Sequence, residues 1–413
     1  MANKAYTFII LAAGHGKRMN SGLPKVLHKI GNFSMLEHII YNAKQLNPEN
    51  IAAVVDLPLI ERLECFEDIK LITQESTLGT GDAVKTAMRN LKELPDLSVV
   101  VVQYGDTPLI KSSTIAKMVS CLEGKSLVCL GFETGNEEYG RLIIEDGFLR
   151  KIVEAQNGEN NGEEFLANAG IMVAYAENLR KLVEKIECNK LINEYYLTDI
   201  VSIAVKSNLN VGYVITDEKE AIGINNRNDL AKAEFYFQED KRKFFTNSGV
   251  TLVAPEAVFF SLDTQIGIDS VIYPYVFFGP KVKIGSGAKI GPFAKCEDTT
   301  IDDSAIVGNF VETKASDIGM DTKIKHLSYI GNTKVGPRSN VGAGTVVCNY
   351  DGKKKHKTNV GSNCFIGANS SLIAPLNIHD DSVIAAGSVI VEDVPEKSLA
   401  IARERQVIKK ITV

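Results

Sequence analysis

Residues 11–28 have the composition of an anion-binding loop. They follow a short apolar run and read LAAGHGKRMNSGLPKVLH. Gly14 and Gly16 allow backbone N–H groups to approach a phosphate closely. Arg18 and Lys25 supply positive charge, arginine as a planar fork and lysine as a point charge. The segment therefore predicts a phosphate-binding loop that follows a strand.

The spacing excludes the two most familiar phosphate loops. A Walker A loop needs a glycine at Leu11 and a serine or threonine at Arg18. A dinucleotide-binding loop needs its third glycine at Met19. From these residues alone, a solvated basic turn remains the alternative to a phosphate site.

The elements around this loop predict an α/β sheet. Apolar strand-like segments alternate with helix-like segments over residues 1–225, which is typical of a mostly parallel sheet covered on both faces. The strand-like segments are 6–12, 51–55 and 97–103, and the helix-like segments are 35–46 and 81–91. Ligands bind at the carboxyl ends of such strands. Residues 11–28 and 104–106 lie at two such ends.

A different periodicity begins near residue 250. In four separate runs, aliphatic or aromatic residues recur at every sixth position, often followed by glycine, which is typical of a hexapeptide-repeat parallel β-helix. These positions are Ile266, Ile272, Phe278, Ile284, Ile290, Ile318, Ile324, Ile330, Val335, Val341, Val347, Val360, Ile366, Leu372, Ile378, Ile384 and Ile390. The lysine-rich segment 348–358 interrupts the repeat, and we interpret it as a protruding loop. This loop either binds a ligand or only extends into solvent.

The two patterns predict two domains joined by a helix. Residues 228–247 read as a helix, with Leu230, Ala233, Phe237 and Phe244 on or near one face. We expect an α/β domain over 1–227, a linker helix over 228–249 and a β-helix over 250–413.

Composition limits the classes of partner. The 413 residues carry a net charge of −5, which argues against a broad nucleic-acid surface. Seven cysteines form no Cys-x-x-Cys pair, so neither a disulfide scaffold nor a metal cluster is indicated. No apolar run is long enough for a membrane span, and no signal peptide is evident. We expect a cytoplasmic protein with no membrane or nucleic-acid partner.

Three stretches carry a family resemblance. Residues 11–28, QESTLGTGDA (74–83) and YGDTPLI (104–110) resemble the sugar nucleotidyltransferases. Together with the β-helix, nearly the whole chain resembles the bifunctional N-acetylglucosamine-1-phosphate uridylyltransferase/glucosamine-1-phosphate acetyltransferase family. The resemblance implies a Rossmann-like α/β domain, a left-handed parallel β-helix and a homotrimer. It implies synthesis of UDP-N-acetylglucosamine from UTP, glucosamine 1-phosphate and acetyl-CoA, through N-acetylglucosamine 1-phosphate.

The resemblance also implies a uridylyltransferase site with Mg²⁺. Asp106 and Asn225 would hold the metal, with Asn226 as the alternative second ligand, because Mg²⁺ prefers oxygen ligands. Arg18 and Lys25 would be catalytic. The residues implied in binding UTP or the UDP-sugar are Leu11, Ala12, Gly14, Lys25, Gln74, Gly79, Thr80, Tyr104, Gly105, Asp106, Gly140, Glu154, Asn168, Tyr196, Thr198 and Asn225. Lys17 departs from the small hydroxyl residue usual in the family.

In the β-helix, KHLSYIG (325–331) resembles the acetyltransferase's catalytic stretch. His326 would be the general base that takes a proton from the sugar amine, since an imidazole suits that role near neutrality; a histidine that only fills a corner of the coil is the alternative. The implied contacts to sugar phosphate or acetyl-CoA are Lys314, Tyr329, Asn340, Ala343, Asn349, Tyr350, Ala368, Ala386 and Arg403.

Three departures concern the acetyltransferase half. The β-helix has fewer coils than is usual, and Ala368 stands where relatives often have serine. Residues 295–300 read KCEDTT where relatives have an arginine that contacts the sugar phosphate. Glu297 and Asp298 lie near that position, and an acidic pair would repel a phosphate. Lys295 and Lys323 are candidates to replace the missing cation.

Three other functions remain as alternatives. The first is a uridylyltransferase whose β-helix is only a trimerisation scaffold, which residues 295–300 favour and His326 disfavours. The second is a hexose-1-phosphate nucleotidyltransferase that uses another nucleotide, although residues 74–83 favour uracil. The third is a non-catalytic regulatory subunit, which Arg18, Lys25 and Asp106 disfavour.

Overall fold

A computed structural model describes residues 6–14, 16–63, 69–155, 164–190 and 193–411. Contacts divide the chain into two compact units, Met1–Tyr236 and Phe237–Val413. The division falls within helix α8 (Arg227–Asn247), which covers most of the predicted linker helix. Among the described residues, no helix has the length and apolar character needed to cross a membrane.

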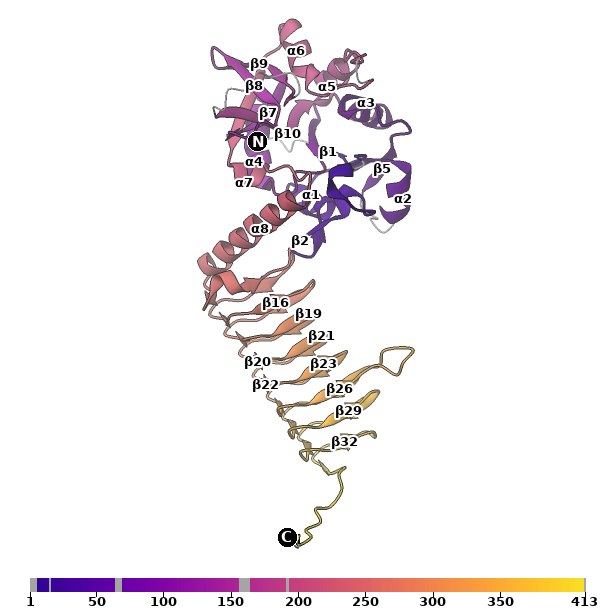
Figure 1. The fold of residues 1–413 in the computed structure, drawn as a ribbon, viewed down its shortest axis with the longest axis vertical. Helices are drawn as coiled ribbons and strands as arrows, with labels where there is room; N and C mark the ends of the chain where they lie inside the picture. Colours follow the sequence, from indigo (N-terminus) through magenta and orange to yellow (C-terminus); the bar gives the residue numbers. More distant parts are fainter. Residues whose placement is uncertain (1–5, 15, 64–68, 156–163, 191–192, 412–413) are drawn as a thin grey trace. The chain divides into compact units, whose positions relative to one another are not determined.

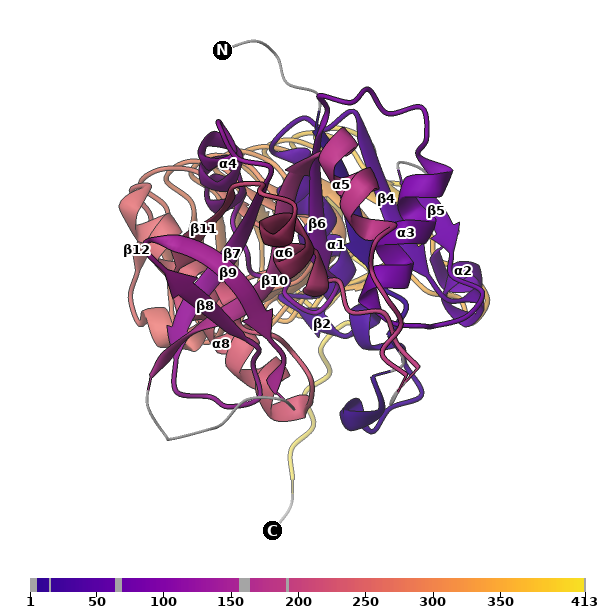
Figure 2. The same cartoon turned by 90° about the horizontal axis from the view of Figure 1, so that it is seen from above.

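The first unit is built on a mostly parallel sheet. Its order is β11-β7-β10-β6-β1-β4-β5, which Figure 2 shows from β11 on the left to β5 on the right. The strands are β1 (Tyr6–Leu11), β4 (Asn50–Val55), β5 (Lys70–Thr73), β6 (Val99–Tyr104), β7 (Leu127–Thr134), β10 (Phe165–Tyr175) and β11 (Val211–Thr216). Only β10 runs antiparallel to its neighbours in this order. The hairpin β8 (Arg141–Glu145) and β9 (Phe148–Val153) joins it through β10, and a small hairpin pairs β2 (Lys29–Ile30) with β3 (Phe33–Ser34).

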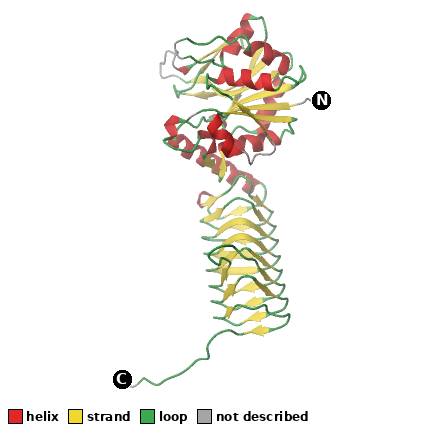
Figure 3. Ribbon diagram, turned by 90° about the vertical axis from the view of Figure 1, so that its right-hand side faces the viewer, coloured by secondary structure: helices red, strands yellow, loops and turns green. Residues whose placement is uncertain are grey.

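Helices cover both faces of this sheet, as the apolar strands predicted. Figure 3 shows the strands as a layer between two groups of helices. The helices are α1 (Met35–Lys44), α2 (Leu57–Leu63), α3 (Thr80–Asn90), α4 (Ser112–Cys121), α5 (Ala176–Val183), α6 (Asp199–Lys206) and α7 (Glu218–Ala221), with short 3₁₀ turns η1 (Lys17–Met19) and η2 (Lys25–Leu27). Strand β1 serves both layers, because Phe8 and Ile10 pack into one core and Ile9 into the other.

The second unit is a parallel β-helix with three faces. The first face contains β12 (Thr251–Leu252), β15 (Val271–Ile272), β18 (Lys289–Ile290), β20 (Ile306–Asn309), β22 (Lys323–His326), β25 (Asn340–Val341), β28 (Phe365–Ile366), β31 (Val383–Ile384) and β33 (Leu399–Ala400). The second face contains β13 (Val258–Phe259), β16 (Val276–Phe278), β19 (Lys295–Ile301), β21 (Glu312–Ile318), β23 (Tyr329–Gly331), β26 (Val346–Cys348), β29 (Ser371–Ile373) and β32 (Val389–Ile390).

The third face is formed partly by strands that turn a corner. Its own strands are β14 (Gln265–Ile266), β17 (Val282–Ile284), β24 (Thr333–Val335), β27 (Thr358–Val360) and β30 (Leu376–Ile378). The ends of β19 and β21 continue onto this face, where Ile301 pairs with Ile284 and Ile318. A 3₁₀ turn, η4 (Pro255–Ala257), precedes β13.

The inward side chains form one continuous apolar core. Three successive coils are one residue shorter than the usual eighteen: Lys289 pairs with Ile306, Ile306 with Lys323, and Lys323 with Asn340. The six-residue count therefore breaks after Cys296, because Ile301 follows after five residues, and the aliphatic pattern missed the inward positions between Ile290 and Ile318. Those positions are occupied by Cys296, Ile301, Val307 and Thr313, all fully buried.

The predicted interruption of the repeat is a loop between β26 and β27. Figure 1 shows it leaving the side of the stacked coils near β26. The coils on either side remain in register, since Asn340 pairs with Phe365 and Val346 with Ser371. The fold prediction is thus confirmed for the β-helix, including the position of its insert.

Helix α8 packs differently from the predicted face. Ala233 and Phe237 are buried as expected, but Phe245 is 1% exposed while Phe244 is 60% exposed. Spacing from Phe237 favours Phe244, because seven residues nearly complete two helical turns. Phe245 instead lies seven residues after Gln238, which is 3% exposed, so it repeats the face of that buried residue. Phe245 packs on Phe260, with ring centroids 4.8 Å apart.

Lys241 on α8 gives a testable pH dependence. Burial lowers the pKa of its ammonium to about 8, and its Nζ donates to the carbonyl of Leu262. In the unfolded chain this pKa is about 10.4. Between these values the unfolded state binds more protons, so stability should rise with pH. We expect the free energy of unfolding to increase by about 2 kcal/mol from pH 7.5 to 10 relative to Lys241→Met, measured by chemical denaturation. If the free energy of unfolding changed equally with pH in the two proteins, Lys241 would not be the cause of this pH dependence.

Candidate functional site

A cavity of about 320 Å³ opens at the carboxyl ends of β1 and β6. Nine predicted residues line it: Leu11, Gly14, Lys25, Gln74, Gly79, Thr80, Tyr104, Gly105 and Asp106. Sequence reasoning missed five other lining residues, Ala13, Val26, Thr77, Ala83 and Glu194. Most of these are small or apolar and carry no chemical signal of their own in the sequence.

The loop after β1 folds back on itself. Gly16 has φ +54°, and a Cβ there would lie 2.6 Å from the Cβ of Lys25. A residue with a side chain would therefore be strained by its backbone conformation and would collide with Lys25. Glycine at this position lets the loop close over the turn that carries Lys25, which explains why the glycine and the lysine occur together.

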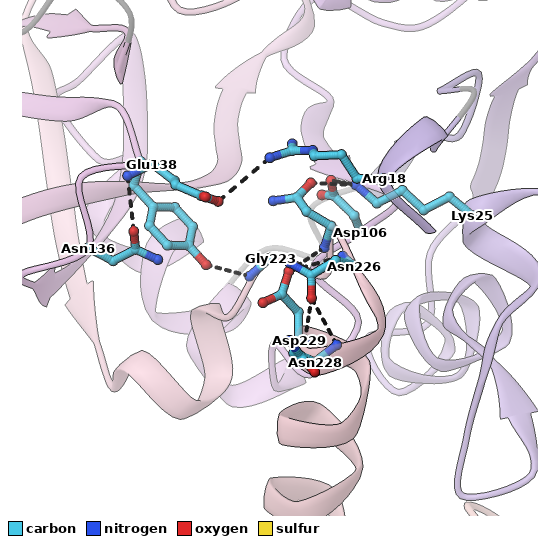
Figure 4. Close-up of polar contacts among 11 residues, drawn as sticks. Arg18, Lys25, Asp106, Asn136, Glu138, Gly223, Asn226, Asn228 and Asp229 are labelled. Atoms are coloured by element: carbon cyan, nitrogen blue, oxygen red, sulfur yellow. Dashed lines mark hydrogen bonds and ion pairs between the residues drawn. The ribbon is translucent and has the colours of Figure 1, made fainter. Parts of the chain in front are cut away.

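Lys25 brings together the two predicted metal ligands. Its Nζ donates to Oδ2 of Asp106 at 2.6 Å and to Oδ1 of Asn225 at 2.8 Å, as Figure 4 shows around Lys25 and Asp106. The lysine side chain is 12% exposed and that of Asp106 is 26% exposed. Two oxygen atoms of the kind that Mg²⁺ prefers as ligands thus accept hydrogen bonds from one ammonium at the edge of the cavity.

The neighbouring Asn226 has a different role. Its Oδ1 accepts from the backbone N–H groups of Asn228 at 2.8 Å and Asp229 at 3.0 Å, which caps the start of α8. The Asp229 carboxylate in turn accepts from the N–H groups of Asn225 and Asn226 at 2.8 and 3.1 Å. Figure 4 shows Asn226 and Asp229 in this arrangement. Asp229 therefore fixes the backbone that carries Asn225.

Gln74 is buried with a fixed amide orientation. Its Nε2 donates to Oδ2 of Asp82 at 2.7 Å and to the carbonyl of Gly79 at 3.3 Å. Both amide hydrogens are thereby engaged, and the amide oxygen is left to accept a hydrogen bond. Gly79 is the residue before α3 and lines the same cavity.

A second polar cluster lies beyond Thr80. Oγ1 of Thr198 donates to the Glu154 carboxylate at 2.5 Å, and burial raises the pKa of that carboxyl. Burial and the Glu154 charge also raise the pKa of Tyr104, whose hydroxyl is hydrogen-bonded with Thr80. Burial followed by the charge of Glu194 raises the pKa of Tyr196. These predicted sugar-site residues therefore meet although they are far apart in sequence.

The structure places other predicted residues around this centre. Asn168 accepts from Gly170 through its side chain, and its N–H donates to Gly140 at 2.7 Å. The N–H of Ala12 donates to Val54. Arg18 does not line the cavity; it is exposed and lies 3.6 Å from the Glu138 carboxylate, as drawn in Figure 4.

On the β-helix, one group of predicted residues lies where the second face meets the third. Lys314 on β21 pairs in register with Gly331 on β23. A Cβ at Gly331 would lie 2.6 Å from the Tyr329 hydroxyl and 2.7 Å from Nδ2 of Asn349. The absence of a side chain at Gly331 therefore lets these two polar groups approach Lys314. Tyr350 follows Asn349 in the protruding loop and is exposed.

A second group lies at the other border of the second face. His326 ends β22, and the register of β22, β25, β28 and β31 places Ala343, Ala368 and Ala386 in line below it. Nη1 of Arg403 donates to the carbonyl of Ala386 at 2.9 Å. Asn340 begins β25 on the adjoining first face. The predicted base and the predicted coenzyme contacts thus share one corner of the coil.

Comparison with known proteins covers both units. Residues 8–178 match the family described as MobA-like NTP transferase domain, and residues 357–392 match the hexapeptide repeat of succinyl-transferase. Over their whole chains, two relatives named "Bifunctional protein GlmU" are 81% identical (Wolbachia sp. subsp. Brugia malayi, strain TRS; 98% of this chain) and 76% identical (Wolbachia pipientis wMel; 100% of this chain). The GlmU of Anaplasma marginale (strain Florida) is 43% identical, with 97% of this chain and 98% of the relative covered.

The chain belongs to the bifunctional GlmU family. Membership in the GlmU family confirms the predicted fold and the prediction of a bifunctional enzyme. The GlmU chain combines a uridylyltransferase with an acetyltransferase, and it serves synthesis of UDP-N-acetylglucosamine.

Stability measurements can distinguish the roles of Asn225 and Asn226 in this GlmU chain. We expect Asn226→Ala to lower the free energy of unfolding by about 1 kcal/mol, because it removes the cap of α8. Asn225→Ala is the matched control and should cost less, since its side chain caps no helix and Asp106 still pairs with Lys25. Urea denaturation of both variants measures this. A larger loss of stability in Asn225→Ala than in Asn226→Ala would contradict the assignment of the α8 cap to Asn226.

Proposed function

We propose that the cavity of the first unit binds UTP and N-acetylglucosamine 1-phosphate and catalyses uridylyl transfer. The observation that carries this proposal is the convergence of Lys25, Asp106 and Asn225 at the cavity edge. A sugar phosphate oxygen attacks the α-phosphorus of UTP in line, and pyrophosphate leaves. The site must hold two polyanions together and offset the charge that develops between them.

The loop after β1 supplies the phosphate contacts. The backbone of Leu11, Ala12 and Gly14 would bind the triphosphate, and the Lys25 ammonium would lie against it. Arg18 is 64% exposed and pairs with Glu138, whose side chain is equally open to solvent. Such an exposed ion pair is weak, so Arg18 can exchange Glu138 for the pyrophosphate of the substrate.

Asp106 and Asn225 are the residues that would hold Mg²⁺. Their oxygens already converge on a cation, and one carboxylate plus one amide oxygen leaves room for phosphate oxygens and water, which suits this ion. When bound, the metal would neutralise charge on the phosphates. Asn226 is the weaker candidate because its side-chain oxygen caps α8.

Gln74 would read the base. With both amide hydrogens held by Asp82 and Gly79, only its oxygen can face the nucleotide, and an acceptor fits the N3–H of uracil. Cytosine presents an acceptor at that position and would be repelled. Asp82 acts here as a positioning residue. Gly140, Glu154, Asn168, Tyr196 and Thr198 would surround the N-acetylated sugar.

Base selectivity tests this assignment. We expect Asp82→Ala to reduce the ratio of kcat/KM for UTP over CTP about tenfold, because Gln74 can then rotate its amide and present a donor. Asp82→Asn keeps an acceptor oxygen and is the matched control. Pyrophosphate release with each triphosphate measures the ratio. An unchanged ratio in Asp82→Ala would remove Asp82 from base recognition.

The β-helix would transfer the acetyl group. His326 would accept a proton from the amine of glucosamine 1-phosphate as its nitrogen attacks the thioester carbonyl, and coenzyme A leaves as the thiol. The line of alanines below His326 leaves space at the corner for the coenzyme. Lys314, Tyr329 and Asn349 would hold the sugar phosphate, with Asn340, Tyr350 and Arg403 completing the site.

Separate inactivation of the two activities tests the two-site assignment. We expect Asp106→Ala to lower uridylyl transfer at least about a thousandfold and to leave acetyl transfer intact. His326→Ala should do the reverse, because the sites use different residues. Pyrophosphate release and coenzyme A thiol release report the two reactions. Loss of both activities in either folded variant would contradict two independent sites.

We also propose a cytoplasmic homotrimer. A column of exposed aromatic residues at a corner of the β-helix favours self-association: Tyr275 stacks on Phe293, and Phe293 on Phe310, with centroids 4.9 and 5.0 Å apart. Six described cysteines are free, which suits a reducing compartment.

A further inference from the structure

Four charged side chains form an alternating array on the second face of the β-helix. Lys295 and Glu297 of β19 pair in register with Glu312 and Lys314 of β21. Nζ of Lys314 lies 2.7 Å from Oε1 of Glu297, which makes this the shortest contact of the array. Nζ of Lys295 lies 3.6 Å from Glu312 and 3.9 Å from Glu297. Every anion therefore has a cation on the neighbouring coil.

The ion pair between Lys314 and Glu297 shifts the pKa of both side chains at the proposed phosphate site. The hydrogen bond from Lys314 lowers the pKa of Glu297, and the same bond raises the pKa of Lys314. Glu297 therefore stays ionised and Lys314 stays protonated near neutrality. The cation that should meet the sugar phosphate is already neutralised by a carboxylate of the same chain.

The structure distinguishes Glu297 from the other charged residues nearby. Asp298 is the exposed corner residue after it, with φ +48°. Lys323 is on the first face, in register with Asn340, so it does not share the sheet of Lys314. Lys295 does share that sheet, and it can take over Glu297 when Lys314 is engaged elsewhere.

We propose that Glu297 determines the affinity of the acetyl-transfer site for its phosphorylated acceptor by competing with the phosphate for Lys314. This proposal rests on the proposed acetyltransferase function. Binding of the acceptor exchanges one ion pair for another: the phosphate takes Lys314, and the Glu297 carboxylate turns to Lys295. The exchange costs affinity, because an existing contact at 2.7 Å must break and because Glu297 remains near a second anion.

The inference predicts a gain of affinity on substitution. We expect Glu297→Gln to lower the KM for glucosamine 1-phosphate about tenfold while kcat stays within about twofold, since the amide removes the competing charge without touching His326. With unphosphorylated glucosamine as acceptor, both constants should stay unchanged. A merely structural role for Glu297 would not produce this split between KM and kcat or between the two acceptors.

The experiment follows sugar-dependent release of coenzyme A thiol by the full chain. Glu312→Gln is the matched control, because Glu312 lies on the same two coils but pairs with Lys295, and its KM should stay as in the unsubstituted protein. Glu297→Ala serves as a second variant if the glutamine protein folds poorly.

Three results are distinguishable. A lower KM for glucosamine 1-phosphate in the Glu297 variants alone supports the inference. Equal KM values in active proteins overturn it and leave the acetyltransferase function in place. Absence of thiol release from the unsubstituted protein and all variants, at any acceptor concentration, overturns the acetyltransferase function itself and the inference with it; the β-helix would then be a scaffold.

Discussion

The first unit depends on one largely buried ammonium, which contacts side chains from two distant segments of the chain. Lys25 contacts Asp106, 81 residues away, and Asn225, 200 residues away. Each contact closes a long chain excursion onto the end of the same sheet. A cation with so little exposure needs these partners, because an unpaired buried charge is costly. The same requirement brings the two predicted metal ligands together at the edge of the cavity.

The β-helix depends on a geometric constraint of its own. Each coil must return its chain to the position directly below the previous coil, so inward side chains from successive coils stack into one core. Outward positions carry no packing requirement and can bear charge. Lys295, Glu297, Glu312 and Lys314 therefore change the electrostatics of a face while the core below them stays apolar. Fold and ligand affinity are set by different residues of the same strands.

Much of this organisation was predictable from local patterns. Phe8–Ile10 and the six-residue repeat identify strands and coils, because burial imposes its period directly on the sequence. The conformation of Gly16, the cap formed by Asn226 and the pairing of Glu297 with Lys314 were not predictable in this way. They depend on which residues tertiary contacts bring together. Phe244 illustrates the limit: its spacing from Phe237 favours burial, yet Phe245 is the buried residue, because it packs against Phe260.

The protruding loop after β26 has a consequence for how this unit tolerates added chain. The coils before and after residues 349–357 align as if the loop were absent, since each coil closes on its neighbours through its own strands. A peptide grafted at the loop tip would thus leave the core untouched. The three seventeen-residue coils offer no such freedom, because their corners follow Glu297, Lys314 and Gly331 immediately. At this one corner, chain length is therefore variable in the coil after β26 and fixed in the coils that carry Glu297 and Lys314.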